Sequence, residues 1–255
     1  MNKMDGAVKE IYHMDELSAQ NTWLNQLHPL IKLLVTFLFI MITVSCSRYQ
    51  LSRVLLLSVY PIVLFIIGDI SFADSLRRLR IVLPLVCLAG IVNPFFDRQP
   101  IASIRGFVIT AGMLSMITLI LKGVLCVLSS YLLIASTSLE SICYALRMLH
   151  IPTILVTQLL LTYRYISLLL TEAEKIMEAY SLRAPGQRGI HIKAWGSLVG
   201  GLLLRSMDRA SALYESMVMR GYTGEFYYGQ KKRLRTKDII YLLLWTAVFA
   251  AIKHC

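Results

Sequence analysis

A stretch of 34 residues, Gly106–Leu139, contains a single charged side chain, that of Lys122. A soluble domain rarely keeps such a run, because about a quarter of its residues are charged. As one straight helix the stretch would reach about 50 Å, whereas the hydrocarbon core of a bilayer is roughly 30 Å thick. We therefore expect it to cross a membrane and to tilt, to break near Lys122, or to extend beyond the bilayer.

The rest of the chain is similarly apolar. Of the 255 residues, 56% are hydrophobic and only 16% are charged, and the mean hydropathy is +0.63. Further apolar runs cover 30–47, 51–67, 81–96 and 239–252. Because a bilayer-spanning backbone must satisfy its own hydrogen bonds, runs of this length favour helices. The sequence predicts an all-α integral membrane protein with about five transmembrane helices.

The basic residues are concentrated in one region. The net charge is +11, and the segment from Lys175 to Lys237 holds 12 basic and 4 acidic residues, which is +8 of that total. Basic residues between membrane spans favour the cytoplasmic side. A second basic patch, Arg77–Arg80, falls on the same side if four spans precede the central region. We therefore predict a cytoplasmic amino terminus and an external carboxyl terminus.

Two stretches, 151–183 and 195–220, repeat apolar residues every three to four positions and become charged in their second halves. Hydropathy alone would assign 155–170 as a span, but Arg164 would then lie in its middle. The apolar spacing also continues into charged sequence, which is typical of an amphipathic helix with one packed seam. We predict two long helices on the cytoplasmic side, with a shorter interfacial helix over 138–150.

These expectations divide the chain into four parts. A cytoplasmic segment, 1–29, precedes four transmembrane helices over 30–137. The cytoplasmic helices occupy 138–237, and the last transmembrane helix follows over 238–255.

The motifs of several enzyme classes are missing from the sequence. There is no GxxxxGK[ST] phosphate loop, no HExxH zinc motif and no GxSxG nucleophile elbow. The five cysteines form no CxxC pair. Lys122 is the one ionisable residue deep in an apolar run, and we interpret it as a bend point. We predict no catalytic residue, no cofactor and no metal site, and basic residues that contact lipid rather than nucleic acid.

Five segments carry a resemblance to a known family. They are 15–34 with its Leu27-His28-Pro29-Leu30 core, Asn93–Phe96, Leu161–Ile166, Leu204–Ala210 and Met219–Tyr222. In this order they resemble the transmembrane T component of energy-coupling-factor (ECF) transporters, the CbiQ/EcfT family. The similarity around 204–222 leans toward the cobalt/nickel subgroup.

The resemblance implies a coupling subunit of an ABC-type importer in a bacterial or archaeal cell membrane. Its partners would be two ABC-type ATPases, which hydrolyse ATP, and a membrane-embedded substrate-binding S component. In that family, short Ala-Arg-Gly-like motifs end two long helices and contact the ATPases. By position these correspond to Leu182-Arg183-Ala184 and Met219-Arg220-Gly221. The first departs from the pattern because it lacks the glycine.

Two other functions stay open at this stage. An integral-membrane enzyme acting on lipids would need a polar cluster facing the membrane, and a self-contained carrier would need polar breaks in mid-membrane helices. The transported substrate, cobalt, nickel or a vitamin, is not specified by this chain.

Overall fold

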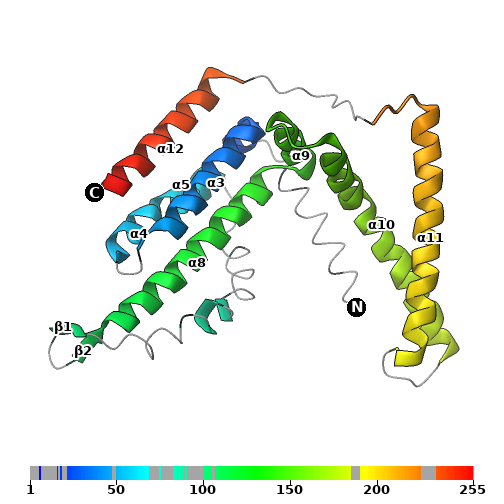
Figure 1. Ribbon diagram of the computed structural model, residues 1–255, viewed down its shortest axis with the longest axis horizontal. Helices are drawn as coiled ribbons and strands as arrows, with labels where there is room; N and C mark the ends of the chain where they lie inside the picture. The colour runs from blue at the N-terminus through cyan, green and yellow to red at the C-terminus, as the bar shows by residue number, and fades with distance from the viewer. Residues whose placement is uncertain are drawn as a thin grey trace. The chain divides into compact units, whose positions relative to one another are not determined.

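The computed structural model describes residues 22–47, 50–68, 100–104, 107–184, 190–224 and 234–254, together with single positions at 6, 16, 18, 75, 83–84, 86–88 and 90. Its contacts divide the chain into two compact units. The bundle unit comprises Glu16–Ile142 and Lys232–Cys255, and the two-helix unit comprises Met1–Asp15 and Cys143–Lys231. Each is described by itself (Figure 1).

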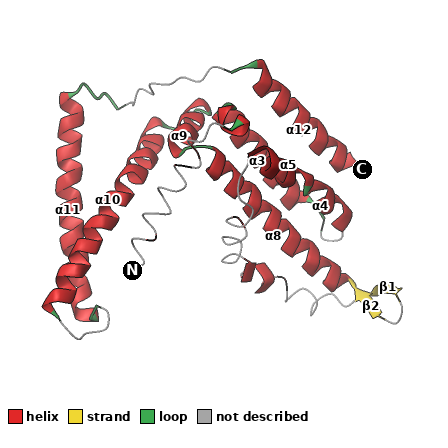
Figure 2. Cartoon of the chain, turned by 180° about the vertical axis from the view of Figure 1, so that it is seen from behind, coloured by secondary structure: helices red, strands yellow, loops and turns green. Residues whose placement is uncertain are grey.

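Helices dominate both units (Figure 2). The bundle unit contains α2 (Trp23–Gln26), α3 (Pro29–Ser45), α4 (Leu51–Leu57), α5 (Val59–Gly68), strands β1 (Pro100–Ile104) and β2 (Phe107–Thr110), α8 (Ala111–Ser136) and α12 (Thr236–His254). The two-helix unit contains α10 (Thr153–Arg183) and α11 (Ile192–Met219), and α9 (Leu139–Met148) spans the sequence boundary between the units. The predicted all-α membrane architecture is confirmed.

One short element departs from that prediction. Strands β1 and β2 form an antiparallel hairpin with a register irregularity between Pro100 and Ala102. The sequence predicts that the apolar stretch from Gly106 crosses a membrane as a helix, but residues 107–110 of that stretch form a strand. The residues of β2 are aromatic or β-branched, which favours a strand over a helix in so short a segment. The long helix therefore begins at Ala111.

Three described helical segments are long and apolar enough to cross a membrane: Leu51–Gly68, Gly112–Ser136 and Thr153–Arg183. The first is α4 and α5 together, and α3 is a shorter apolar helix. The span predicted over 81–96 lies outside the described residues, apart from a few single positions. Length and composition alone thus leave α10 among the candidate spans, although its sequence predicts an amphipathic surface helix.

Pro61 explains why α4 and α5 are separate helices. Proline has no N–H and its ring crowds the carbonyl four residues earlier, which here belongs to Leu57, the last residue of α4. The chain turns at Ser58, whose hydroxyl donates to the Leu55 carbonyl at 2.6 Å. The helix then resumes, with the Ile62 N–H donating to the Ser58 carbonyl at 3.3 Å.

An aromatic cluster forms the centre of the bundle unit. The rings of Phe39 and Tyr60 stack with centroids 4.5 Å apart, and Trp245 meets Tyr60 edge-on at 4.7 Å. Phe249 closes the cluster, 5.7 Å from both Phe39 and Trp245. The buried Tyr60 hydroxyl lies 3.1 Å from the hydroxyl of Thr36, so its polar group is satisfied within the core. This cluster joins α3, α5 and α12.

Two lysines cap helix ends inside the bundle unit. The Lys32 ammonium of α3 donates to the carbonyl of Ser136, the last residue of α8, at 2.6 Å. In return, the Lys122 ammonium of α8 donates to the carbonyls of Val44, at 3.4 Å, and Cys46 at the end of α3. Helix ends leave carbonyls unpaired and carry partial negative charge, so a cation is favourable there. Both lysines therefore stabilise the antiparallel packing of α3 on α8.

This arrangement gives Lys122 a role that its sequence position did not indicate. Helix α8 runs from Ala111 to Ser136 without interruption, so the helix does not break at that lysine. Its neighbour Gly123 allows a close helix contact instead, because a Cβ there would lie 2.8 Å from Cγ1 of Val86.

Candidate functional site

Helices α10 and α11 run antiparallel. Glu172 of α10 faces Arg205 and Arg209 of α11, and nearer the end of α10 the His191 N–H donates to the Tyr180 hydroxyl at 3.3 Å. The carboxyl end of α10 therefore lies beside the amino-terminal part of α11, and the two helices diverge toward the carboxyl end of α11, as Figure 1 also shows. Because α11 has 28 residues, the two carboxyl ends are on the order of 40 Å apart.

The predicted triplet Met219-Arg220-Gly221 ends α11 in a Schellman motif. Arg220 is the last residue with a near-helical backbone, and Gly221 follows with φ +81°. The Tyr222 N–H donates to the Met217 carbonyl at 3.0 Å, and the Gly221 N–H donates to the Val218 carbonyl at 2.9 Å. The positive φ explains why glycine occupies this position. The cap fixes the backbone from which the exposed Arg220 side chain projects.

The triplet Leu182-Arg183-Ala184 ends α10 differently. Arg183 is the last helical residue, and Ala184 follows with φ −125° while its N–H donates to the Tyr180 carbonyl at 3.0 Å. No left-handed residue is needed at this point, which agrees with the missing glycine. The residues that follow, 185–189, lie outside the described part of the chain.

The structure exposes most of the six predicted site residues but does not bring the two triplets together. Leu182 is 82% exposed and Met219 86% exposed, and both arginines and Gly221 are exposed as well, whereas Ala184 is half-buried. Each triplet stands at its own end of the helix pair. The sequence therefore located two separate exposed tips rather than one composite site.

Helix α11 has an unusual lack of burial for an apolar sequence. No residue of α11 is buried, and in α10 only Val156 and Thr157 are. The exposed apolar side chains of α11 include Trp195, Val199, Leu203, Leu204, Met207, Tyr214 and Val218. At Gly196, Gly200 and Gly201 an added Cβ would meet nothing within 4 Å.

An open groove lies between α10 and α11. Its volume is about 430 Å³, and its walls are mainly apolar. Leu161, Tyr165 and Leu169 line it from α10, and Leu213 and Met217 line it from α11. Tyr222, which follows Gly221, also lines the groove. The two helices thus meet across a cavity rather than through interdigitated side chains.

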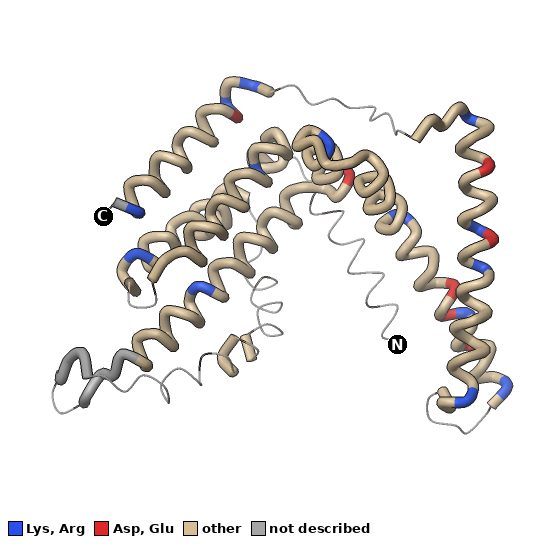
Figure 3. The backbone as a smooth tube through the Cα atoms, viewed as in Figure 1, with Lys and Arg blue, Asp and Glu red and all other residues tan. Residues whose placement is uncertain are grey.

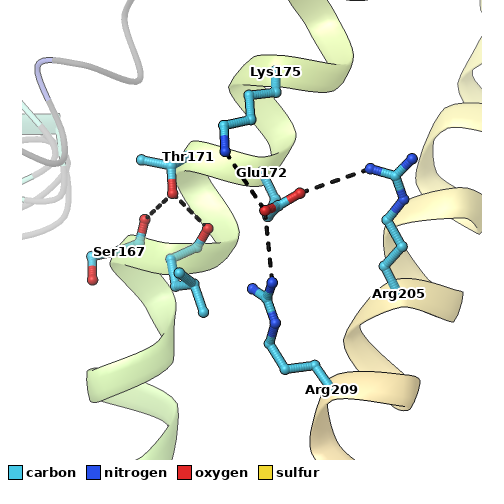
Figure 4. Close-up of polar contacts among 7 residues, drawn as sticks. Ser167, Thr171, Glu172, Lys175, Arg205 and Arg209 are labelled. Carbon is cyan, nitrogen blue, oxygen red and sulfur yellow. Dashed lines mark hydrogen bonds and ion pairs between the residues drawn. The ribbon is translucent and has the colours of Figure 1, made fainter.

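Charged residues gather along α11 and the second half of α10 (Figure 3), whereas Lys122 is the one charged residue of α8. One group of these charged side chains surrounds Glu172 (Figure 4). Its carboxylate lies 3.7 Å from Arg209, 3.8 Å from Arg205 and 3.9 Å from Lys175. Lys175 lies on the same helix as Glu172, whereas Arg205 and Arg209 lie on α11. The contacts to α11 could not be predicted from the sequence, because spacing within one helix does not reveal its partner.

Within the part of the chain that the structure describes, no three His, Cys, Asp or Glu residues cluster as metal ligands would. The described arrangement therefore consists of two exposed cationic helix ends, an apolar groove and a salt-bridge cluster, which together suit protein–protein contact.

Comparison with known proteins identifies the family. A family model described as "CbiQ: Cobalt transport protein" matches residues 20–230. The chain belongs to the CbiQ family. Its members are membrane components of transporters, which agrees with the apolar helices of the bundle unit.

Three relatives of this CbiQ-family chain have informative matches. An uncharacterized protein of Methanocaldococcus jannaschii is 25% identical, and the match covers 90% of this chain and 81% of the relative. The energy-coupling factor transporter transmembrane protein EcfT of Listeria innocua is 26% identical over 80% of this chain and 82% of its own length. The nickel permease LarQ of Lactiplantibacillus plantarum is 29% identical over 46% of this chain and 42% of its own. The predicted CbiQ/EcfT family is thereby confirmed.

Proposed function

We propose that this CbiQ-family chain is the transmembrane coupling subunit of an ECF-type importer. It would transmit ATP hydrolysis by two partner ATPases to a substrate-binding membrane protein. The observation that carries the proposal is the placement of Arg183 and Arg220 on exposed carboxyl ends at opposite ends of one antiparallel helix pair. Two separate tips can engage two separate ATPase chains.

The chemistry of each tip suits such a contact. A guanidinium group can form two parallel hydrogen bonds to a carboxylate of a partner protein. The carboxyl end of a helix carries partial negative charge, so the positive charge of each arginine is favourable at the end of its own helix. Exposed Leu182 and Met219, one residue before each arginine, add apolar area that a partner groove would bury.

We assign α10 to the cytoplasmic membrane surface rather than to a membrane span. Its second half carries Glu172, Glu174, Lys175 and Glu178, and each charge at the centre of a bilayer would cost at least about 2.5 kcal/mol. Its antiparallel partner α11 carries Arg205, Asp208 and Arg209, so a pair crossing the bilayer would bury charges from both helices. A surface position leaves these charges in water.

The exposed apolar face of α11 suits a second kind of partner. Large apolar patches on a protein surface mark interaction sites, and α11 exposes Leu203, Leu204 and Met207 within one stretch of five residues. We assign this face to the membrane-embedded S component. ATP-driven movement of the two tips would then be passed to the substrate-binding protein through α11.

For the cargo we propose a divalent transition-metal ion, cobalt or nickel. The matching family model is described as a cobalt transport protein, and one relative is named a nickel permease. The cargo would be recognised by the S component, and in this chain the described residues hold no metal cluster. Uptake of ⁵⁷Co²⁺ or ⁶³Ni²⁺ by cells that express the complete gene set, compared with uptake of labelled vitamins, would identify it.

The proposal is tested by co-purification in mild detergent. The wild-type chain should bring down two ATPase chains and a small hydrophobic protein. Arg220→Glu should weaken ATPase association, and the double variant with Arg183→Glu should abolish it while the chain still inserts into the membrane. Lys253→Glu is the matched control, because Lys253 is an exposed basic residue near the end of α12, in the bundle unit. Normal transport by the double variant would show that these arginines do not couple the ATPases.

A further inference from the structure

Glu172 is the meeting point of charges from both long helices. It lies on α10 with 22% of its side chain exposed, and both of its oxygens are engaged. Oε1 lies 3.7 Å from the Arg209 guanidinium and 3.9 Å from the Lys175 ammonium, and Oε2 lies 3.8 Å from the Arg205 guanidinium. One carboxylate is thus shared by three cations, two of them on the other helix (Figure 4).

The spacing of the partners makes this contact specific. Arg205 and Arg209 are four residues apart, so they lie one turn apart on the same face of α11. Lys175 is three residues after Glu172 and covers the same side of α10. The four residues therefore define one relative position of α10 and α11, and a rotation of either helix would separate the charges.

Apolar packing does little to fix the angle between these helices. No residue of α11 is buried, and the space between the helices is the open groove of about 430 Å³. A second hollow, which Glu172 and Arg205 line, shares Leu169, Ser206 and Arg209 with the groove, so the ionic contact lies directly beside the groove. A pair without an interdigitated core can change its crossing angle unless a polar contact holds it.

The cluster also lies midway between the two proposed coupling tips. Glu172 precedes Arg183 by eleven residues, and Arg209 precedes Arg220 by eleven residues. Eleven residues make three helical turns, so each tip projects about 16 Å beyond the cluster along its own helix. Because the cluster joins α10 and α11 between the two tips, it determines how a movement of Arg183 changes the position of Arg220.

We propose that Glu172 is a positioning residue, an ionic latch that sets the crossing angle of α10 and α11 through Arg205 and Arg209. The inference rests on the proposed coupling function and adds the element that determines the geometry of the two tips. At 3.7–3.9 Å the charges attract without direct hydrogen bonds, and the arginines are 67% and 42% exposed. Such a contact is weak enough to yield during an ATP cycle and restores the resting angle afterwards.

A charge-exchange series tests the latch. Glu172→Arg places like charges together, and Arg205→Glu with Arg209→Glu does the same with opposite sign. The triple variant that combines these changes restores attraction with the signs reversed. In the reconstituted complex, Glu172→Arg should lower transport per ATP hydrolysed at least about fivefold, the lower end of measured couplings between sites. The triple variant should recover most of that loss.

Two further measurements separate positioning from general stability. Spin labels at Ala179 on α10 and Val218 on α11, both exposed, report the crossing angle as a distance in a chain without its native cysteines. The distance should shift or broaden in Glu172→Arg and return in the triple variant. Glu178→Arg is the matched control, since Glu178 is exposed on the same helix, and it should change neither distance nor transport.

The outcomes distinguish the latch from the coupling function. Normal coupling in Glu172→Arg overturns the latch and leaves the arginine tips untouched. If Glu172→Arg fails to assemble, the triple variant decides: recovery supports the latch, and continued failure overturns it. ATPase chains that stay bound after reversal of Arg183 and Arg220 overturn the coupling function itself, whatever the Glu172 variants do.

Discussion

The carboxylate of Asp238 accepts the backbone N–H of His28 at 2.9 Å, across 210 residues of sequence. Its second oxygen accepts the N–H of Arg235 at 2.8 Å. His28 is the N-cap of α3, and Arg235 directly precedes α12. The buried Asp238 carboxylate therefore accepts a backbone N–H at the amino-terminal end of each of these two helices. Helix amino termini carry partial positive charge, which makes an ionised carboxylate favourable at this junction.

We expect Asp238→Ala to lower the free energy of unfolding by about 2–4 kcal/mol, because two cap interactions disappear and the buried His28 N–H loses its acceptor. Asp238→Asn keeps one accepting oxygen and should lose about half as much. Unfolding by SDS titration in detergent micelles measures both. Lys237→Ala is the control, since Lys237 is the exposed neighbour on the same turn. A stability of Asp238→Ala equal to that of the control would contradict the capping role.

A second prediction concerns Lys32. We interpret its burial, with 4% of the residue exposed, as the consequence of its bond to the Ser136 carbonyl. Lys32→Met keeps the apolar stem but leaves that carbonyl without this donor, so the free energy of unfolding should fall by about 1–3 kcal/mol. Lys253→Met, at an exposed position near the end of α12, should change it by less than about 0.5 kcal/mol. Comparable losses in both variants would argue against a specific cap.

Two glycine substitutions should act in opposite directions. At Gly123 a Cβ would lie 2.8 Å from Val86, so Gly123→Ala forces the two segments apart and should cost about 1–3 kcal/mol. At Gly200 a Cβ meets nothing within 4 Å, and Gly200→Ala should stabilise α11 by about 1 kcal/mol through helix propensity. Thermal unfolding in detergent reports both. If Gly200→Ala were tolerated alone but blocked assembly of the complex, a partner would be shown to pack there.

The helices themselves were well predicted from the sequence. The apolar run 30–47 corresponds to α3 (Pro29–Ser45), and 239–252 lies within α12 (Thr236–His254). The stretch 195–220 corresponds to α11, and its predicted terminator Gly221 has the expected positive φ. These features depend on local periodicity and cap chemistry, which are visible in a single sequence.

The buried charges were not predicted. Lys32 near the start of an apolar run suggests a side chain reaching toward lipid headgroups, yet it bonds to Ser136 at the far end of α8. Asp238 and His28 lie farther apart still, by 210 residues of sequence against 104 for Lys32 and Ser136. Contacts of this kind depend on which helices pack together, and nothing in the spacing of one helix states its neighbour. The same reason hides the contact of Glu172 with α11.

The predicted topology is open to a direct test. We expect Leu234→Cys, at an exposed position just before α12, to react with a membrane-impermeant thiol reagent only from the cytoplasmic side, in a chain without native cysteines. The basic run Lys231–Lys237 carries this expectation, because basic residues next to a span favour the cytoplasm. Labelling of Leu234→Cys in intact cells, where the reagent reaches only the outer surface, would contradict the predicted orientation of the chain in the membrane.

The last prediction uses the cap of α11 to move Arg220 without changing it. Gly221 has φ +81°, a conformation that costs an ordinary L-residue about 1–2 kcal/mol. Gly221→Val should therefore break the Schellman motif, redirect Arg220 and reduce ATPase co-purification severalfold. Asparagine tolerates this conformation far better, so Gly221→Asn should retain most of the association. If valine and asparagine behaved alike, the orientation of Arg220 would not depend on the cap. A loss equal to that of Arg220→Glu in the valine variant alone would show that the guanidinium acts from the position that the cap defines.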